Sequence, residues 1–63
     1  MKLYYVIKAT SDKSYVSIYA DRFSKHINEA MEFESEQQAI EYSERNFDYY
    51  FKFTIEKIYE ITK

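Results

Sequence analysis

Side chains alternate between two faces along the first third of the chain, a pattern that is typical of half-buried β-strands. The alternation covers residues 3–9 and again residues 15–20, and both segments contain several Val, Ile and Tyr residues. Residues 10–14 between them are polar and have the length of a hairpin connection. We therefore predict two antiparallel strands joined by a turn. Because the chain has no Gly and no Pro, its turns have to rely on Asn, Asp and Ser.

Residues 34–47 change to a helical period. Ser35 is a good N-cap, and Gln38 three residues later completes a capping-box pattern. Asn46 can adopt the left-handed conformation that ends many helices. One narrow stripe of this helix faces inward, and it consists of Ala39, Ile40, Ser43 and Phe47. The small residues in the stripe favour close packing of the helix against a flat sheet.

Residues 50–61 form the longest stretch of alternation and predict the last strand. In a regular strand, Lys57 would point toward the core. A bulge near Glu56 and Lys57 would instead turn Ile58 inward. The sequence leaves both alternatives open.

Residues 21–33 carry mixed signals, because their apolar positions fit a loop, a helix or a short strand. Our interpretation is a loop or single turn through residues 26–30, followed by a short third strand at residues 31–33. The element order is then β-β-β-α-β. We predict an α+β fold in one small domain, residues 1–63, with a mainly antiparallel sheet of three to four strands and a single helix on one face.

The predicted sheet has a second face that is unusually rich in aromatic residues. Without a second helix, that face would be exposed, and exposed apolar patches often mark binding surfaces. Its members by alternation are Tyr4, Val6, Lys8, Tyr15, Ser17, Tyr19, Tyr50, Lys52 and Thr54. Two hypotheses follow. The face is a homodimer interface, because Tyr is common in interface hot spots, or it binds single-stranded nucleic acid by base stacking. The net charge of −2 favours the interface.

The composition excludes several kinds of site. The chain has no Cys, which excludes disulfides and thiolate metal ligands. The lack of Gly excludes phosphate-binding loops and dinucleotide fingerprints, so we expect no cofactor. His26 is the single histidine and cannot complete a zinc site with a second one; we expect a surface or capping role for it and no enzymatic activity. No apolar run reaches the ~20 residues of a membrane span, so we expect a cytoplasmic protein without a membrane partner.

Acidic residues concentrate around the predicted helix. Residues 28–48 contain seven acidic residues and one basic residue, Arg45. Glu41 and Glu44 point away from the apolar stripe. This pattern is typical of a solvated helix face, and it also fits an acidic surface that occupies a basic groove on a partner.

Three segments resemble small uncharacterised proteins encoded by bacteriophages of low-GC Gram-positive bacteria. They are the opening run YYVIK at residues 4–8, the second strand beginning with Tyr15 and Val16, and the run INEAMEFESEQQA at residues 27–39. The resemblance covers structural residues and no catalytic motif. It implies a non-enzymatic protein–protein interaction module, of the kind that inhibits or modulates a host or defence protein in the host cytoplasm. Single-stranded nucleic-acid binding by the Tyr/Lys face remains the alternative.

Overall fold

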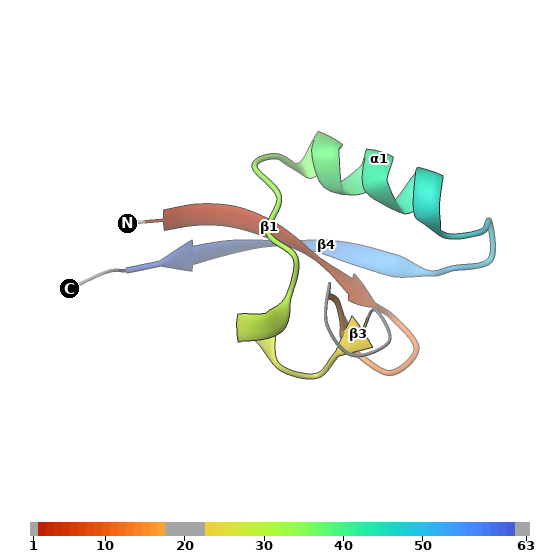
Figure 1. The fold of residues 1–63 in the computed structure, drawn as a ribbon, viewed down its shortest axis with the longest axis horizontal. Helices are drawn as coiled ribbons and strands as arrows, with labels where there is room; N and C mark the ends of the chain where they lie inside the picture. The colour runs from red at the N-terminus through yellow and green to blue at the C-terminus, as the bar shows by residue number, and fades with distance from the viewer. Residues whose placement is uncertain (1, 18–22, 62–63) are drawn as a thin grey trace.

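The computed structural model describes residues 2–17 and 23–61. Its strands form one antiparallel sheet in the order β3-β2-β1-β4, and a single α-helix packs on the sheet. The predicted α+β fold is therefore confirmed. Figure 1 shows α1 above the β1–β4 pair, with η2 and β3 below it. In chain order the elements are β1 (Lys2–Ala9), β2 (Tyr15–Val16), β3 (Phe23–Ser24), the short 3-10 helix η2 (Ile27–Glu29), α1 (Glu36–Asn46) and β4 (Phe53–Glu60).

The first and last strands form the longest pairing in the sheet. β1 and β4 stay in register without interruption from Lys2↔Glu60 to Ala9↔Phe53. The bulge alternative is therefore wrong, and Lys57 shares the face that carries Ile55. Lys57 is nevertheless exposed, because an 11-residue helix is only about 16 Å long, whereas an eight-residue strand spans about 27 Å. The end of the ribbon that carries the two termini projects beyond the helix (Figure 1).

The middle of the chain differs from the prediction. Residues 31–33 do not form a strand; the third strand is Phe23–Ser24. Phe33 makes only an isolated bridge to Tyr5, with backbone hydrogen bonds of 2.9 Å in both directions. The edge of β1 is thus shared between Tyr15 in the hairpin and Phe33 further along. Of the predicted strand at residues 15–20, the structure describes β2 and Ser17, and Tyr19 lies outside the described residues.

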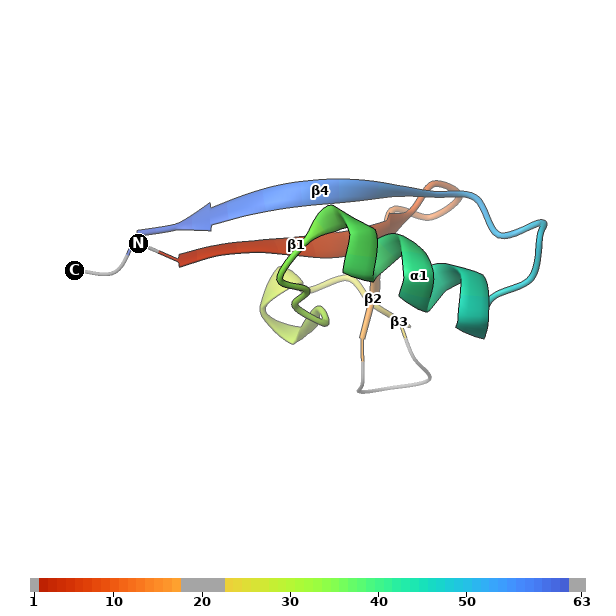
Figure 2. The same ribbon diagram turned by 90° about the horizontal axis from the view of Figure 1, so that it is seen from above.

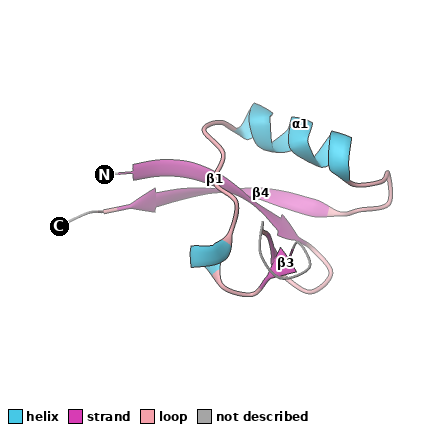
Figure 3. Cartoon of the chain, in the orientation of Figure 1, coloured by secondary structure: helices cyan, strands magenta, loops and turns pink. Residues whose placement is uncertain are grey.

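The last strand begins three residues later than predicted, at Phe53 (Figure 3). A turn holds the preceding residues out of the sheet. The Asp48 carboxylate accepts a hydrogen bond from the Tyr50 N–H at 3.0 Å, and the Asp48 carbonyl accepts one from the Phe51 N–H at 3.1 Å. Asp commonly bonds its own backbone two residues on in this way. Tyr50 therefore belongs to a turn and not to the sheet face.

The core lies between the sheet and α1. Its fully covered members are Ile7, Val16, Phe33 and Ala39, and aromatic rings from the loops surround them. Ala39 and Ser43 of the predicted helix stripe are buried, as expected. The stripe is wider than predicted, because Tyr42 also turns inward and packs its ring 5.4 Å from that of Phe33.

The two ends of α1 are stabilised by different side-chain hydrogen bonds. The Ser35 hydroxyl accepts from the Gln38 N–H at 3.2 Å, which confirms the N-cap. The Gln38 side chain accepts from the Glu34 N–H rather than from that of Ser35, so the capping box is shifted by one residue. Asn46 is not left-handed; instead its side-chain amide donates to the Tyr42 carbonyl at 2.9 Å. No helix among the described residues is long and apolar enough to cross a membrane.

The second face of the sheet is not the open surface that the sequence predicts. Tyr4 is only 7% exposed and Val6 is 0% exposed, although neither belongs to the core under α1. The segment around η2 lies on this side (Figure 1). It is held there by Glu29, whose carbonyl accepts from the Ser17 hydroxyl at 2.7 Å and whose carboxylate accepts from Ser24. Tyr4 and Val6 are therefore not part of an open apolar surface.

The β1–β2 turn carries local backbone strain. Lys13 has φ 61°, the left-handed region that costs a non-Gly residue about 1–2 kcal/mol. Asp12 stabilises the turn, because its carboxylate accepts from the Ser14 hydroxyl at 2.7 Å and from the Ser14 N–H at 3.1 Å. These hydrogen bonds lower the pKa of Asp12 below its ordinary value.

Replacing Lys13 with Gly should stabilise the fold. Gly relieves the strain at φ 61°, and its greater freedom in the unfolded chain offsets part of the gain. We expect the free energy of unfolding to rise by about 0.5–1 kcal/mol, measured by urea denaturation. Ser11→Gly in the same turn, at a position without positive φ, is the control and should be destabilising. An equal effect of both changes would show that the strain at Lys13 is not relieved by Gly.

The burial of the Tyr4 hydroxyl predicts that the fold loses stability at alkaline pH. Burial, followed by the nearby Glu60 carboxylate, raises the pKa of the Tyr4 hydroxyl above its ordinary value of 10.0. The folded chain therefore keeps a proton that the unfolded chain releases near pH 10. This contribution to stability is complete below pH 10 and is lost as the pH rises through the folded-state pKa.

Tyr4→Phe should remove the Tyr4 part of this alkaline loss. Thermal unfolding of the wild type and the variant from pH 8 to pH 11 should give melting temperatures that move toward each other or cross as the pH rises. Tyr49→Phe, which changes a side chain that is 87% exposed, is the control and should follow the wild type. Parallel curves for Tyr4→Phe and the wild type would contradict the assignment.

Candidate functional site

The structure does not gather the predicted tyrosine platform. Tyr4 is buried and pairs with Ile58, whereas Tyr50 stands in the turn before β4 and is 81% exposed. Tyr15 is half-buried, with the Lys8 ammonium 5.7 Å from its ring centre. Lys52 is exposed and also precedes β4. A flat stacking surface made of Tyr4, Tyr15 and Tyr50 is therefore absent among the described residues.

The predicted acidic residues of α1 are exposed but lie over different hollows. Glu44 borders a groove next to the start of β4. Glu41 borders a shallower hollow beside Tyr42 and Arg45, and its carboxylate accepts from the Gln37 amide at 3.2 Å. The two carboxylates thus do not act on one surface, and only Glu44 belongs to the site described next.

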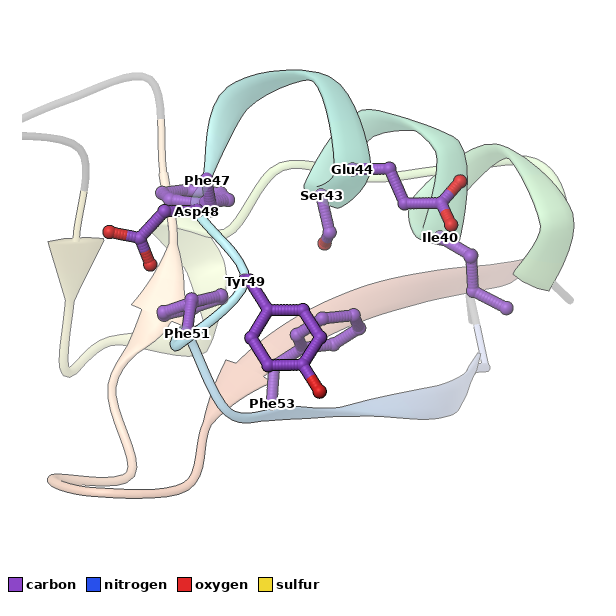
Figure 4. Close-up of a pocket in the computed structure, with 8 residues that line it drawn as sticks. All are labelled: Ile40, Ser43, Glu44, Phe47, Asp48, Tyr49, Phe51 and Phe53. Atoms are coloured by element: carbon purple, nitrogen blue, oxygen red, sulfur yellow. The ribbon is translucent and has the colours of Figure 1, made fainter.

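A groove of about 420 Å³ lies between α1, the turn that follows it and the first residue of β4. This volume falls within the range of small-molecule and side-chain binding pockets. Figure 4 shows its lining, in which aromatic rings dominate and carboxylates stand at the rim. The lining residues are Ile40, Ser43, Glu44, Phe47, Asp48, Tyr49, Phe51 and Phe53.

Stacked rings build one wall of the groove. The Phe47 and Phe51 rings stack with centres 4.4 Å apart, and Phe51 stacks on Phe53 at 5.5 Å. The turn at Asp48 makes this possible, because it brings the end of α1 directly back to β4. The same turn sends the next two side chains outward: Tyr49 is 87% and Tyr50 81% exposed, with their rings edge to face at 5.6 Å. Aromatic rings therefore line the groove; Tyr49 belongs to its exposed rim, and Tyr50 stands next to Tyr49 outside it.

Ser43 gives the groove an unusual polar group. The residue is only 3% exposed, and its hydroxyl has no hydrogen-bond partner among the described residues. The side chain points from α1 into the space between helix and strand (Figure 4). A buried hydroxyl without a partner costs about 1–3 kcal/mol, and native structures have few of them. The hydroxyl oxygen is itself almost fully covered, so it lies behind the lining of the groove and not on its open surface.

The groove offers binding groups and no arrangement for metal chemistry. Across residues 2–17 and 23–61, no cluster of three His, Asp or Glu side chains is placed to hold a metal ion. His26 is exposed at the start of η2, where its N–H donates to the Ser24 hydroxyl at 3.1 Å. It stands at the N-cap position of η2 without a side-chain cap hydrogen bond, and the predicted surface position is confirmed. Neither His26 nor Ser24 lines the groove.

Sequence reasoning missed the groove although part of its signal was present. The sequence pattern gives Tyr49 no role and places Phe47 in the helix stripe that faces the core. The run DYYF at residues 48–51 combines a turn-forming Asp with three aromatic side chains. Three consecutive aromatic side chains cannot all point inward from a tight turn. The run therefore indicates that some of these rings are exposed and that at least one is covered.

Ser43→Ala should stabilise the isolated chain. The change removes a buried hydroxyl without a partner and gains about 0.5 kcal/mol of helix propensity. We expect a total increase of about 1–2 kcal/mol in the free energy of unfolding, measured by chemical denaturation. An increase no larger than the propensity difference would mean that the hydroxyl has a partner in solution.

Comparisons with protein-family models, with curated proteins and with solved structures find no match for this chain. What the groove binds is therefore inferred from its own residues.

Proposed function

We propose that this chain is a non-enzymatic protein–protein interaction module that takes an apolar side chain of its partner into the groove between α1 and β4. The observation that carries the proposal is the groove itself: an open hollow lined by aromatic rings, with the carboxylates of Glu44 and Asp48 at its rim. A protein ligand can supply both an apolar side chain for the rings and a basic group for the rim. In this proposal the binding surface is the groove, and not the sheet face that the alternation of side chains predicts.

The two tyrosines beside the groove are the expected hot spots. Tyr is enriched among interface residues that dominate binding energy, because it combines a large apolar ring with a polar tip. Tyr49 and Tyr50 expose more than four fifths of their surface and contact each other edge to face. Lys52 lies 5.7 Å from the Tyr49 ring centre and restricts it on one side. Docking would cover both rings at a small cost in side-chain entropy.

The charges of the rim favour a partner with a basic group next to its apolar anchor. Glu44 and Asp48 both border the groove. Opposite charges on a partner would raise the association rate by electrostatic steering. The same carboxylates disfavour a nucleic-acid backbone. The dispersal of Tyr4, Tyr15 and Tyr50 also argues against base stacking.

The class of partner is suggested by the resemblance to small bacteriophage-encoded proteins. It makes a bacterial host or defence protein in the cytoplasm the first candidate, with this chain as inhibitor or modulator. A basic groove or surface of a nucleic-acid enzyme has the charge that Glu44 and Asp48 would complement.

Affinity capture with a matched set of variants tests the proposal. The tagged wild type and Tyr50→Ser are incubated with lysate of a low-GC Gram-positive bacterium, with and without nuclease. We expect a nuclease-resistant protein band that Tyr50→Ser loses, with affinity for the purified partner reduced by 30-fold or more, the factor for a hot spot of about 2 kcal/mol. The control is Tyr59→Ser, which changes a 57% exposed tyrosine far from the groove. Equal capture by all three chains, or capture that nuclease abolishes, would contradict the proposal.

A further inference from the structure

β4 leaves one complete edge of the sheet open. It is the terminal strand in the order β3-β2-β1-β4. In Figure 2, no other labelled element lies beside its outer side. An edge strand presents unpaired N–H and C=O groups, which can pair with a strand of another chain. β4 is eight residues long and pairs with β1 without a bulge, so its edge is straight enough to serve as a template.

The hydrogen bonds of the sheet identify which residues of β4 have outward backbone groups. Tyr5 and Ala9 of β1 bond away from β4, to Phe33 and Ser14. Antiparallel pairs alternate between bonded and non-bonded positions. The β4 residues opposite these odd-numbered positions therefore also point away from β1. Along the outer edge, the free backbone groups belong to Phe53, Ile55, Lys57 and Tyr59.

We propose that the occupant of this edge is a second copy of the chain, whose β4 pairs antiparallel with the first about a two-fold axis at Ile55. In this register Ile55 faces Ile55 of the second copy, Thr54 faces Glu56, and Phe53 faces Lys57. The two sheets then become one continuous sheet. This proposal goes beyond the proposed function, because it concerns self-association and requires no other protein.

Charge selects this register among the symmetric alternatives. An axis at Glu56 would place two glutamates opposite each other, and an axis at Lys57 would do the same with two lysines. An axis at Ile58 would oppose Glu56 and Glu60. Like charges directly opposite are destabilising in a sheet. The axis at Ile55 gives the longest overlap within β4 that has no such pair.

The same register brings opposite charges together at the groove. Directly opposed residues project to the same face, so Lys57 of the second copy would stand beside Phe53, one wall of the groove. Glu44 forms another part of that wall. In the single chain, Lys57 is exposed, and its ammonium lies 5.4 Å from the centre of the Tyr59 ring. A lysine on an edge strand normally discourages pairing; here the acidic rim of the groove provides its partner, twice per dimer.

Cross-linking of purified chains tests the register directly. The chain has no cysteine, so Thr54→Cys and Glu56→Cys each introduce a single thiol. Mild oxidation of the mixture should give a disulfide-linked heterodimer at ten or more times the yield of either homodimer, because the proposed register opposes residue 54 to residue 56. Tyr59→Cys, at a more exposed position, is the control and should give little product. A dominant homodimer of either variant, or no linked product above the control, would overturn the register.

Sedimentation equilibrium with charge reversal tests the groove contact. We expect the wild type to dimerise at micromolar to hundred-micromolar concentration, and Lys57→Glu to weaken the dimer at least tenfold. The double variant Lys57→Glu, Glu44→Lys should recover most of the loss. A strict monomer at all concentrations, or a Lys57→Glu dimer of unchanged affinity, would overturn the proposal. Because both experiments use the pure chain, their failure leaves the lysate result for the groove unaffected.

Discussion

The close approach of α1 to the sheet is the contact on which the other features depend. Ala39 is fully buried in the same cluster as Ile7, and Ser43 lies one turn further along the buried side of the helix. Because both side chains are small, the helix axis can come close enough for Tyr42 and Phe47 to reach the rings of the sheet and loops. A larger residue at either position would lift the helix and open the aromatic cluster.

The same contact explains which parts of the β1–β4 ribbon are exposed. A short helix fixed over one half of the β1–β4 ribbon leaves the other half without cover on that face. Leu3 and Tyr59 are exposed there, although the alternation of side chains places them on the same face of the sheet that α1 covers. At the covered end, the chain returns from the helix to β4 in a tight turn, and the space under Ser43 and Glu44 remains as the groove. The packing of α1 thus determines both the buried core and the position of the groove.

The features that sequence predicts well are those that repeat along one element. The faces of β1 and the N-cap and inward stripe of α1 follow from periodicity and from local hydrogen bonding at Ser35. The pairing of Phe33 with Tyr5 is a different kind of feature, because it depends on residues distant in sequence that have no local signature. The groove was also beyond reach, since its shape depends on how Asp48 turns the chain. Ser43 carried a faint signal, as a polar residue in an apolar stripe, which fits close packing equally well.

The pairing of β1 with β4 also governs when the fold can form. Lys2 lies opposite Glu60, so the longest pairing of the sheet joins the two ends of the described chain, which lie next to each other in Figure 1. Closing so long a loop costs chain entropy before the contacts compensate for it, which slows folding relative to a helical protein of equal size. During synthesis, β1 is made before β4 and has no long partner until β4 follows. The β1–β4 pairing therefore forms only after β4 has been synthesised, and β1 lacks this partner until then.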